Sequence, residues 1–220
     1  MTIDVSIIIP TKAGRERVLG VTLGAIAAST PPEVEIIQPE EYATVGEAWN
    51  AGAERAKGGV LLFTTDDCVP HAGWYEAMLS TWGFQTEPHP DDVPLNEDSY
   101  VERVVAAPVL EYPHGDVEAY GSMGGGMKLP AGYDWMRVRS SGVLAMPRAL
   151  WLEVGPFADL HYFVDDDWCW RAELAGIQIR VRDAFRMTHA HQPDRAVIAA
   201  SHAHQRAFLE RVCERRRVER

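Results

Sequence analysis

The sequence predicts an α/β fold, a single domain in which helices cover both faces of a mostly parallel sheet. The first observation is that apolar runs alternate with helical patterns over residues 1–82, which is typical of βαβ units and their parallel strands. The second is that the runs at residues 5–9 and 60–63 are almost entirely apolar, as expected for strands buried on both faces. A chain of 220 residues is long enough for one sizeable core and short for two domains.

The first third of the chain contains three predicted strands and three predicted helices. Val18, Leu19, Leu23 and Ile26 recur along one side of the first helix, which is the spacing of an amphipathic helix, and two prolines follow it. Two glycines close the second helix. The predicted strands are residues 5–9, 34–37 and 60–63, and the predicted helices are residues 15–28, 47–57 and 74–82.

The rest of the chain is less regular. Residues 87–99 are rich in Pro, Asp and Glu and are predicted as an exposed loop, and three consecutive glycines at 124–126 could form the hinge of a lid. Regular structure is predicted as strands at residues 101–110, 143–146 and 177–181 and as helices at residues 147–154, 167–175 and 195–217.

Composition excludes several classes of function. The net charge of −11 argues against a protein whose main partner is nucleic acid or an anionic membrane. The cysteines number three and are widely spaced, so no disulfide framework is implied. No segment approaches the roughly 18 apolar residues of a membrane span, and the apolar run at residues 3–9 is too short for the core of a signal peptide. We therefore expect a cytoplasmic protein.

Two acidic clusters about a hundred residues apart carry the candidate chemistry. Asp66 and Asp67 follow the third predicted strand, and three consecutive aspartates begin at Asp165. Ligands of parallel sheets bind at the carboxyl ends of the strands, and hard cations take oxygen ligands. The sequence therefore predicts a metal held by Asp66 and Asp67, and the later cluster could supply a base.

Six segments of the chain, in order, resemble the motifs of family 2 glycosyltransferases, which have the GT-A fold. They include a first strand that ends in Pro-Thr, a Gly-x-Ala-x-Asn-x-Gly helix start, a site at the place of the Asp-x-Asp motif, and a cluster similar to Glu-Asp-x-Asp-Trp-x-Trp-Arg. Thr64 and Val164 depart from the acidic residues usual in these motifs. The matching segments are residues 5–11, 35–41, 46–52, 63–67, 141–157 and 164–171.

The resemblance implies inverting transfer of a sugar from a nucleotide-diphosphate donor to an acceptor hydroxyl. Residues 1–82 would form the nucleotide-binding half of a single domain, residues 100–191 the acceptor and catalytic half, and residues 193–220 a C-terminal helix. The residues expected to bind the donor, where neighbouring strands end, are Pro10, Thr11, Arg15, Glu40, Asn50, Thr65 and Asp66.

The metal implied by the resemblance is Mn²⁺ or Mg²⁺, because the candidate ligands are mainly oxygens. Asp66 and Asp67 share the assignment. A histidine near the end of the matched region completes the site in the family, and His189 and His191 both qualify, because residues two apart on an extended segment face the same side.

Asp165 is the expected general base, which would take the proton of the acceptor hydroxyl. Ionised neighbours would raise the pKa of Asp165. We expect Asp166 or Asp167 to cap the following helix. The residues expected to contact the acceptor are Trp135, Asp166 and Trp168, since aromatic faces suit sugar rings.

Two alternatives stay open at this stage. A sugar-phosphate nucleotidyltransferase would need a glycine-rich first turn, which residues 11–15 lack. A non-catalytic relative that binds a nucleotide or a partner protein fits Val164 and Thr64 but not the retained aspartates. The acceptor, whether a glycan, a small molecule or a protein, is not named by the sequence.

Overall fold

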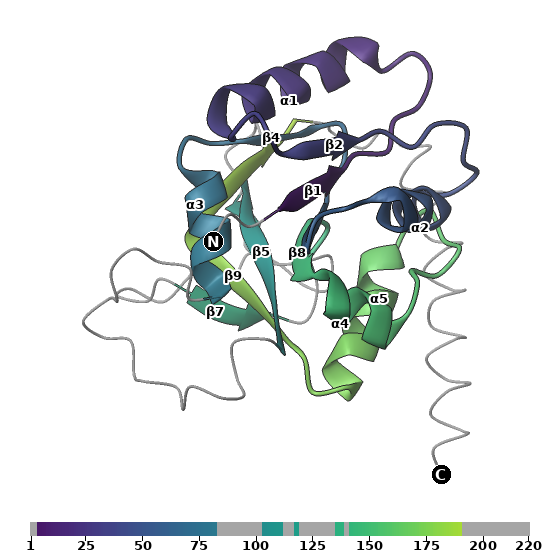
Figure 1. Cartoon of the computed structure of the whole chain (residues 1–220), viewed down its shortest axis with the longest axis vertical. Helices are drawn as coiled ribbons and strands as arrows, with labels where there is room; N and C mark the ends of the chain where they lie inside the picture. The colour runs from purple at the N-terminus through teal and green to yellow at the C-terminus, as the bar shows by residue number, and fades with distance from the viewer. Residues whose placement is uncertain (1–3, 83–102, 112–116, 119–134, 139–140, 191–220) are drawn as a thin grey trace.

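The described strands form a single sheet (Figure 1). The computed structural model describes residues 4–82, 103–111, 117–118, 135–138 and 141–190. The strands are β1 (Val5–Ile8), β2 (Glu35–Ile37), β3 (Val60–Phe63), β4 (Cys68–Pro70), β5 (Val104–Glu111), β6 (Val117–Glu118), β7 (Trp135–Val138), β8 (Leu144–Pro147) and β9 (Gln178–His189). The helices are α1 (Glu16–Ser29), α2 (Val45–Arg55), α3 (Trp74–Leu79) with the 3₁₀ turn η1 (Ser80–Trp82), α4 (Arg148–Val154) and α5 (Val164–Leu174).

The sheet is parallel in its first part and mixed beyond it. Its order is β2-β1-β3-β8-β5-β9-β4, with β6 paired to β5 and β7 to β9. The parallel pairing that the sequence predicted joins β1 to β2 and to β3. Strand β8 runs antiparallel to both β3 and β5, whereas β9 is parallel to β5. Neighbouring parallel strands need a long crossover, usually a helix. The sequence predicts no helix between residues 83 and 142, which agrees with the antiparallel pairing of β5 and β8.

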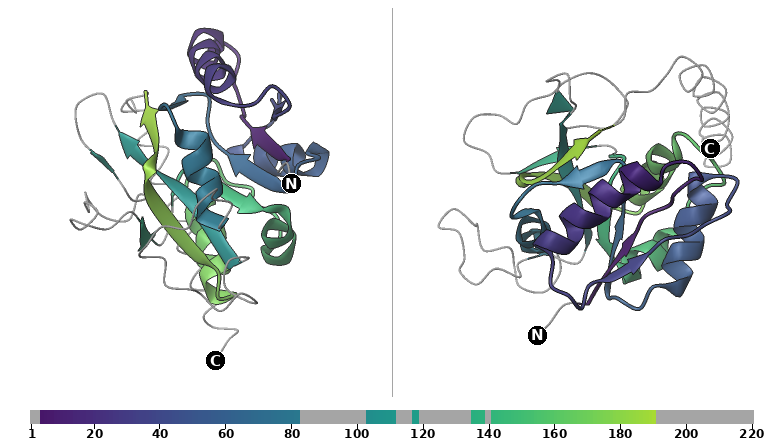
Figure 2. Two further views of the ribbon diagram at one scale, coloured as in Figure 1. Left: turned by 60° about the vertical axis from the view of Figure 1, so that its left-hand side comes forward. Right: turned by 90° about the horizontal axis from the view of Figure 1, so that it is seen from above.

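Helices cover both faces of the sheet, as the sequence predicted. Successive strand residues point to opposite faces, so β3 contributes Leu61 and Phe63 to one apolar cluster and Val60 and Leu62 to another. The first cluster also contains residues of α2, α4 and α5, and the second contains residues of α1 and α3. Figure 2 shows these two layers from further directions.

The β4–β9 pair is the part of the sheet that matters most for the site. Strand β4 has three residues and follows the turn after β3. It pairs antiparallel with the end of β9, so that Cys68 lies opposite His189, and the Ala190 amide donates to the Asp67 carbonyl at 2.8 Å. This pairing brings residues from the far end of the described chain beside Asp67.

The glycines and the asparagine of the α2 motif have a structural explanation. A Cβ on Gly46 would lie 1.9 Å from the Ala158 carbonyl oxygen, and one on Gly52 would lie 2.3 Å from Ile8 Cγ2. The Asn50 amide donates to the Phe157 carbonyl at 2.9 Å, and its oxygen accepts from the Phe157 amide at 2.8 Å. Helix α2 is therefore held against β1 on one side and against the segment that precedes α5 on the other.

Several boundaries differ from the sequence prediction. Helix α5 begins at Val164, three residues before the predicted start, and β9 continues to His189 rather than ending at Val181. The predicted loop at 87–99, the glycines at 124–126 and the predicted helix at 195–217 lie outside the described residues. In the part of the chain that the structure describes, no helix has the length and apolar character needed to cross a membrane.

A glycine-to-alanine pair tests the contact between α2 and the segment before α5. Gly46→Ala should destabilise the protein by about 1–3 kcal/mol or prevent folding, because its Cβ overlaps backbone that cannot move freely. Gly20→Ala on α1, where nothing lies within 4 Å of the added Cβ, should be neutral or stabilising by up to about 1 kcal/mol. Urea unfolding of both variants decides this, and equal stability would contradict the packing described.

Candidate functional site

Asp66 and Asp67 lie directly after β3, and both are buried, at 5% exposure each. Arg15, at the start of α1, binds both carboxylates. Its Nε donates to Asp66 Oδ2 at 2.8 Å, and its Nη2 lies 2.7 Å from Asp66 Oδ1 and 2.7 Å from Asp67 Oδ2. Because buried carboxylates are costly without a counter-charge, this guanidinium is a central part of the site.

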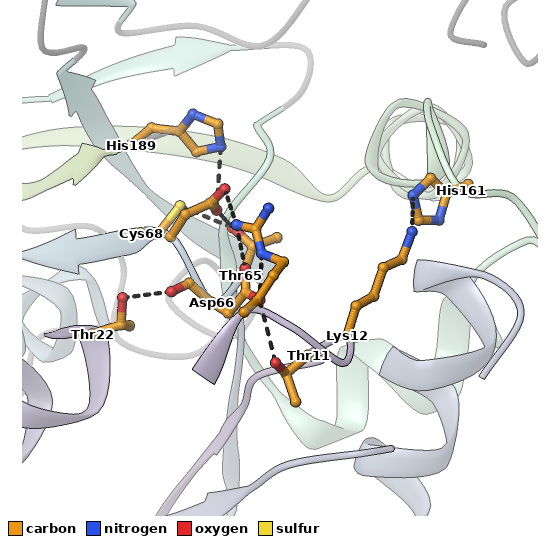
Figure 3. Close-up of polar contacts among 10 residues, drawn as sticks. Thr11, Lys12, Thr22, Thr65, Asp66, Cys68, His161 and His189 are labelled. Carbon is orange, nitrogen blue, oxygen red and sulfur yellow. Dashed lines mark hydrogen bonds and ion pairs between the residues drawn. The ribbon is translucent and has the colours of Figure 1, made fainter. Parts of the chain in front are cut away.

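Other side chains reach the same two carboxylates (Figure 3). Thr11 Oγ1 donates to Asp66 Oδ2 at 3.3 Å, and Thr65 Oγ1 donates to Asp67 Oδ1 at 2.7 Å. His189 Nε2 lies 3.5 Å from Asp67 Oδ1. Each of the four carboxylate oxygens therefore has a nitrogen or hydroxyl of the protein beside it. The structure thus brings Thr11, Arg15, Thr65, both aspartates and His189 together.

The surroundings of Asp67 favour its ionised form. Burial raises the pKa of Asp67, but the charge of His189, the Thr65 hydrogen bond and the Arg15 guanidinium together outweigh burial and hold that pKa below its ordinary value. Asp67 is accordingly a carboxylate at neutral pH.

Asp67, Cys68 and His189 form a candidate metal centre, with one donor atom of each lying within 4.8 Å of the others. Cys68 is the softest donor of this set, and thiolates suit Mn²⁺ less well than oxygen or imidazole ligands do. Burial, followed by the charge of Asp67, raises the pKa of the Cys68 thiol to about 12. The carboxylate of Asp67 and the imidazole of His189 are the donors that fit Mn²⁺.

The second acidic cluster occupies the first turn of α5. Phe163, at the N-cap, has a left-handed φ of 61° and provides no side-chain cap. The expectation that Asp166 or Asp167 caps this helix is therefore wrong, because the helix begins before both. Asp167 is instead buried and accepts from Arg171 Nε at 3.0 Å, one turn later. Arg171 also donates to the Val154 and Pro156 carbonyls.

Asp165 is half-buried at this helix start. Burial and, after it, the charge of Asp166 raise the pKa of Asp165 well above its ordinary value. A carboxyl of this kind takes up a proton at a higher pH than an exposed aspartate does. Its environment is consistent with the role of a general base, which remains a prediction.

Two of the expected ligand contacts are wrong. Trp168 is fully buried, packs on Phe157 at a centroid distance of 5.7 Å and donates from Nε1 to the Gly155 carbonyl, so it is a core residue and cannot contact an acceptor. The side-chain amide of Asn50 is bonded to the backbone of Phe157 and is not directed at a donor.

The remaining expectations are neither supported nor contradicted. Asp166 is only 4% exposed. Pro10 is half-buried beyond β1 and Glu40 is exposed beyond β2, as expected for residues at the carboxyl edge. Trp135 lies in β7 opposite Arg182, and its side chain, like His191, is outside what the structure describes.

Lys12 Nζ lies 3.0 Å from His161 Nε2, a contact that links the first βα loop to the segment leading into Asp165 (Figure 3). Sequence reasoning missed this contact, as well as the strand β4 and the Arg15 pairing. Charge complementarity could have indicated the pairing, since Arg15 and the aspartates follow neighbouring parallel strands.

The hydroxyl of Thr65 provides a test of the electrostatics. Thr65→Val removes a hydrogen bond to ionised Asp67 and should cost about 1.5–3 kcal/mol near pH 7. The pKa of Asp67 is depressed in the folded protein, so its contribution is present above the ordinary aspartate pKa of about 4 and is lost as pH falls through the folded value. The difference between variant and wild type, measured by urea unfolding, should shrink towards pH 3. A difference that does not change with pH would contradict this account.

No protein-family model matches the chain, and no curated protein matches its sequence. Solved structures do match. GalNAc-T7, crystallised with UDP, GalNAc and Mn²⁺, superposes with a TM-score of 0.66 at 14% identity, over 87% of this chain and 44% of that one. S. aureus TarS 1-349 superposes with a TM-score of 0.58 at 12% identity, over 86% of this chain and 60% of that one. Both are GT-A glycosyltransferases, so this chain, which spans about half the length of those proteins, has the GT-A fold.

Proposed function

We propose that this protein is a glycosyltransferase that moves a sugar from a nucleotide-diphosphate donor to an acceptor hydroxyl, with inversion at the anomeric carbon. The observation that carries the proposal is the buried Asp66–Asp67 pair at the carboxyl end of β3, with His189 3.5 Å from Asp67. The same fold holds UDP and Mn²⁺ in the GalNAc-T7 structure. Membership of family 2 in particular rests on the sequence motifs.

The donor would bind at the carboxyl edge of β1, β2 and β3, where ligands of such sheets bind. Thr11 and Arg15 lie there in contact with Asp66, and Pro10 and Glu40 end neighbouring strands. A nucleoside diphosphate is anionic, and Arg15 and Lys12 supply positive charge on the first βα loop of an otherwise acidic protein.

Asp67 and His189 would hold a divalent cation, Mn²⁺ or Mg²⁺. Asp67 Oδ1 and His189 Nε2 are near enough to share one ion, and the depressed pKa of Asp67 keeps its carboxylate ionised. When bound, the cation neutralises charge that develops on the leaving diphosphate.

Asp165 would accept the proton of the acceptor hydroxyl while the acceptor oxygen bonds to the anomeric carbon and the bond to the diphosphate breaks. Its raised pKa makes it a stronger base than an exposed aspartate. Asp167 and Arg171 would act by holding the start of α5 and the segment at residues 154–156 in place. The acceptor is a glycan, a small molecule or a protein side chain.

Substitution of Asp67 tests the donor site. Asp67→Asn should abolish Mn²⁺-dependent stabilisation by a nucleoside diphosphate, because the amide removes the charge that faces His189. Asp4→Asn, which changes an exposed residue before β1 at the opposite end of the strand, should respond like wild type. Thermal unfolding with UDP or GDP, each with and without Mn²⁺, provides the measurement. An unchanged shift in Asp67→Asn would place the metal elsewhere.

Substitution of Asp165 tests the chemistry. Asp165→Asn should keep donor binding and lower turnover at saturating donor by roughly 10²–10⁴-fold, since an amide of nearly the same size cannot take the proton. Wild-type turnover should fall as pH falls through the raised pKa of Asp165.

The matched variant is Asp166→Asn. It removes a charge that raises the pKa of Asp165, so the acidic limb of the pH–rate profile should move to lower pH while turnover at high pH is largely kept. Full turnover by Asp165→Asn would remove the base from the mechanism. Donor binding without any transfer or donor hydrolysis in the wild-type protein would favour the non-catalytic alternative.

A further inference from the structure

Arg15 contacts three of the four carboxylate oxygens of Asp66 and Asp67. Its Nη2 lies 2.7 Å from an oxygen of each aspartate, and its Nε donates to Asp66 as well. Asp67 has one oxygen beside Arg15 and the other beside Thr65 and His189. A cation that binds Asp67 through both oxygens must therefore take the place of the guanidinium at Asp67 Oδ2.

The physical reason for this arrangement is burial. Asp66 and Asp67 are each 5% exposed, and the burial of two adjacent carboxylates is costly without a positive charge beside them. The guanidinium supplies that charge, and the interaction with the aspartates raises its own pKa in spite of burial. Arg15 remains protonated at any relevant pH, so a change of pH does not release the carboxylates.

Arg15 has a side chain that is only partly enclosed by the protein. Its side chain is 27% exposed, and it follows Gly14, whose φ is +85°. The loop from Lys12 to Arg15 lies at the edge where the diphosphate of a donor would bind. An arginine leaving Asp67 would have phosphate oxygens as its next partners.

We propose that Arg15 is the resting counter-ion of the carboxylate pair, and that a divalent cation displaces it from Asp67 so that it becomes available to the diphosphate. This inference rests on the proposed function. Arg15 acts by controlling access of the cation to Asp67, and not on the reacting atoms. It makes binding of the cation unfavourable without a nucleotide. It also couples the two ligands, because the cation frees Arg15 to bind the diphosphate, and a diphosphate that binds Arg15 frees Asp67 for the cation.

The test is the affinity for Mn²⁺ alone, measured by titration calorimetry or from the spin-resonance signal of free Mn²⁺. Arg15→Gln should bind Mn²⁺ roughly tenfold or more tightly than wild type, since the competing charged hydrogen bonds are gone. Arg17→Gln, which removes the same charge from an exposed position on α1, should bind Mn²⁺ like wild type. Wild-type or weaker affinity in Arg15→Gln would overturn the inference.

The same titrations with UDP or GDP added measure the coupling between nucleotide and Mn²⁺ binding. The factor by which the nucleotide tightens Mn²⁺ binding should be smaller in Arg15→Gln than in wild type and Arg17→Gln. An equal factor in all three proteins would overturn the coupling. Absence of Mn²⁺ binding in every protein, with and without nucleotide, would overturn the metal-dependent proposal as well, so the two failures are distinguishable.

Removal of Arg15 leaves two buried carboxylates without their counter-charge, and Arg15→Gln could fail to fold. Arg15→Lys keeps the charge but cannot bond both carboxylates with a planar fork. It should bind Mn²⁺ with an affinity between those of wild type and the glutamine variant, and Mn²⁺ should raise its unfolding temperature by more than it raises that of wild type. A smaller rise would contradict displacement.

Discussion

The close packing of α2 against the segment at residues 157–160 determines where the second acidic cluster lies. Gly46 admits the Ala158 carbonyl at a distance that a Cβ would forbid, and its amide donates to the Leu160 carbonyl at 3.1 Å. Asn50 bonds both backbone groups of Phe157. This segment leads directly into α5. The amino-terminal half of the sheet and the helix that carries Asp165 are therefore joined through backbone groups, which tolerate little displacement.

Two arginines in the segments that resemble family motifs donate to backbone carbonyls. Arg148 donates to the carbonyls of Ala53, Ala56 and Gly58, which lie at the end of α2 and just beyond it. Carbonyls at a helix end have no partner within the helix, so a cation there supplies one. Arg171 does the same for residues 154–156 while paired with Asp167. The segments that resemble family motifs thus contain two arginines that hold loops in place.

The sequence was sufficient for β1 to β3, for α1 to α3 and for the acidic pair after β3, because buried strands and amphipathic helices leave clear periodic patterns. The sequence was insufficient where tertiary contacts determine whether a strand forms or a side chain is buried. Strand β4 is three residues long and is stabilised by its partner β9, which no local pattern reveals. Trp168 and Asn50 were misassigned because burial and backbone bonding depend on how α5 and α2 pack. The start of α5 was misplaced because an aspartate resembles a cap in sequence, whereas Phe163 adopts the left-handed conformation there.

The two basic partners of Asp67 enter the chain at very different times during synthesis. Arg15 precedes the aspartates, whereas His189 follows them by more than a hundred residues and reaches Asp67 through the β4–β9 pairing. Chains emerge from the ribosome amino end first. Asp66 and Asp67, which follow β3, therefore have the Arg15 counter-charge available as soon as they are synthesised, well before His189 is added. A nascent chain that lacked Arg15 would have to keep Asp66 and Asp67 in water until β9 was made.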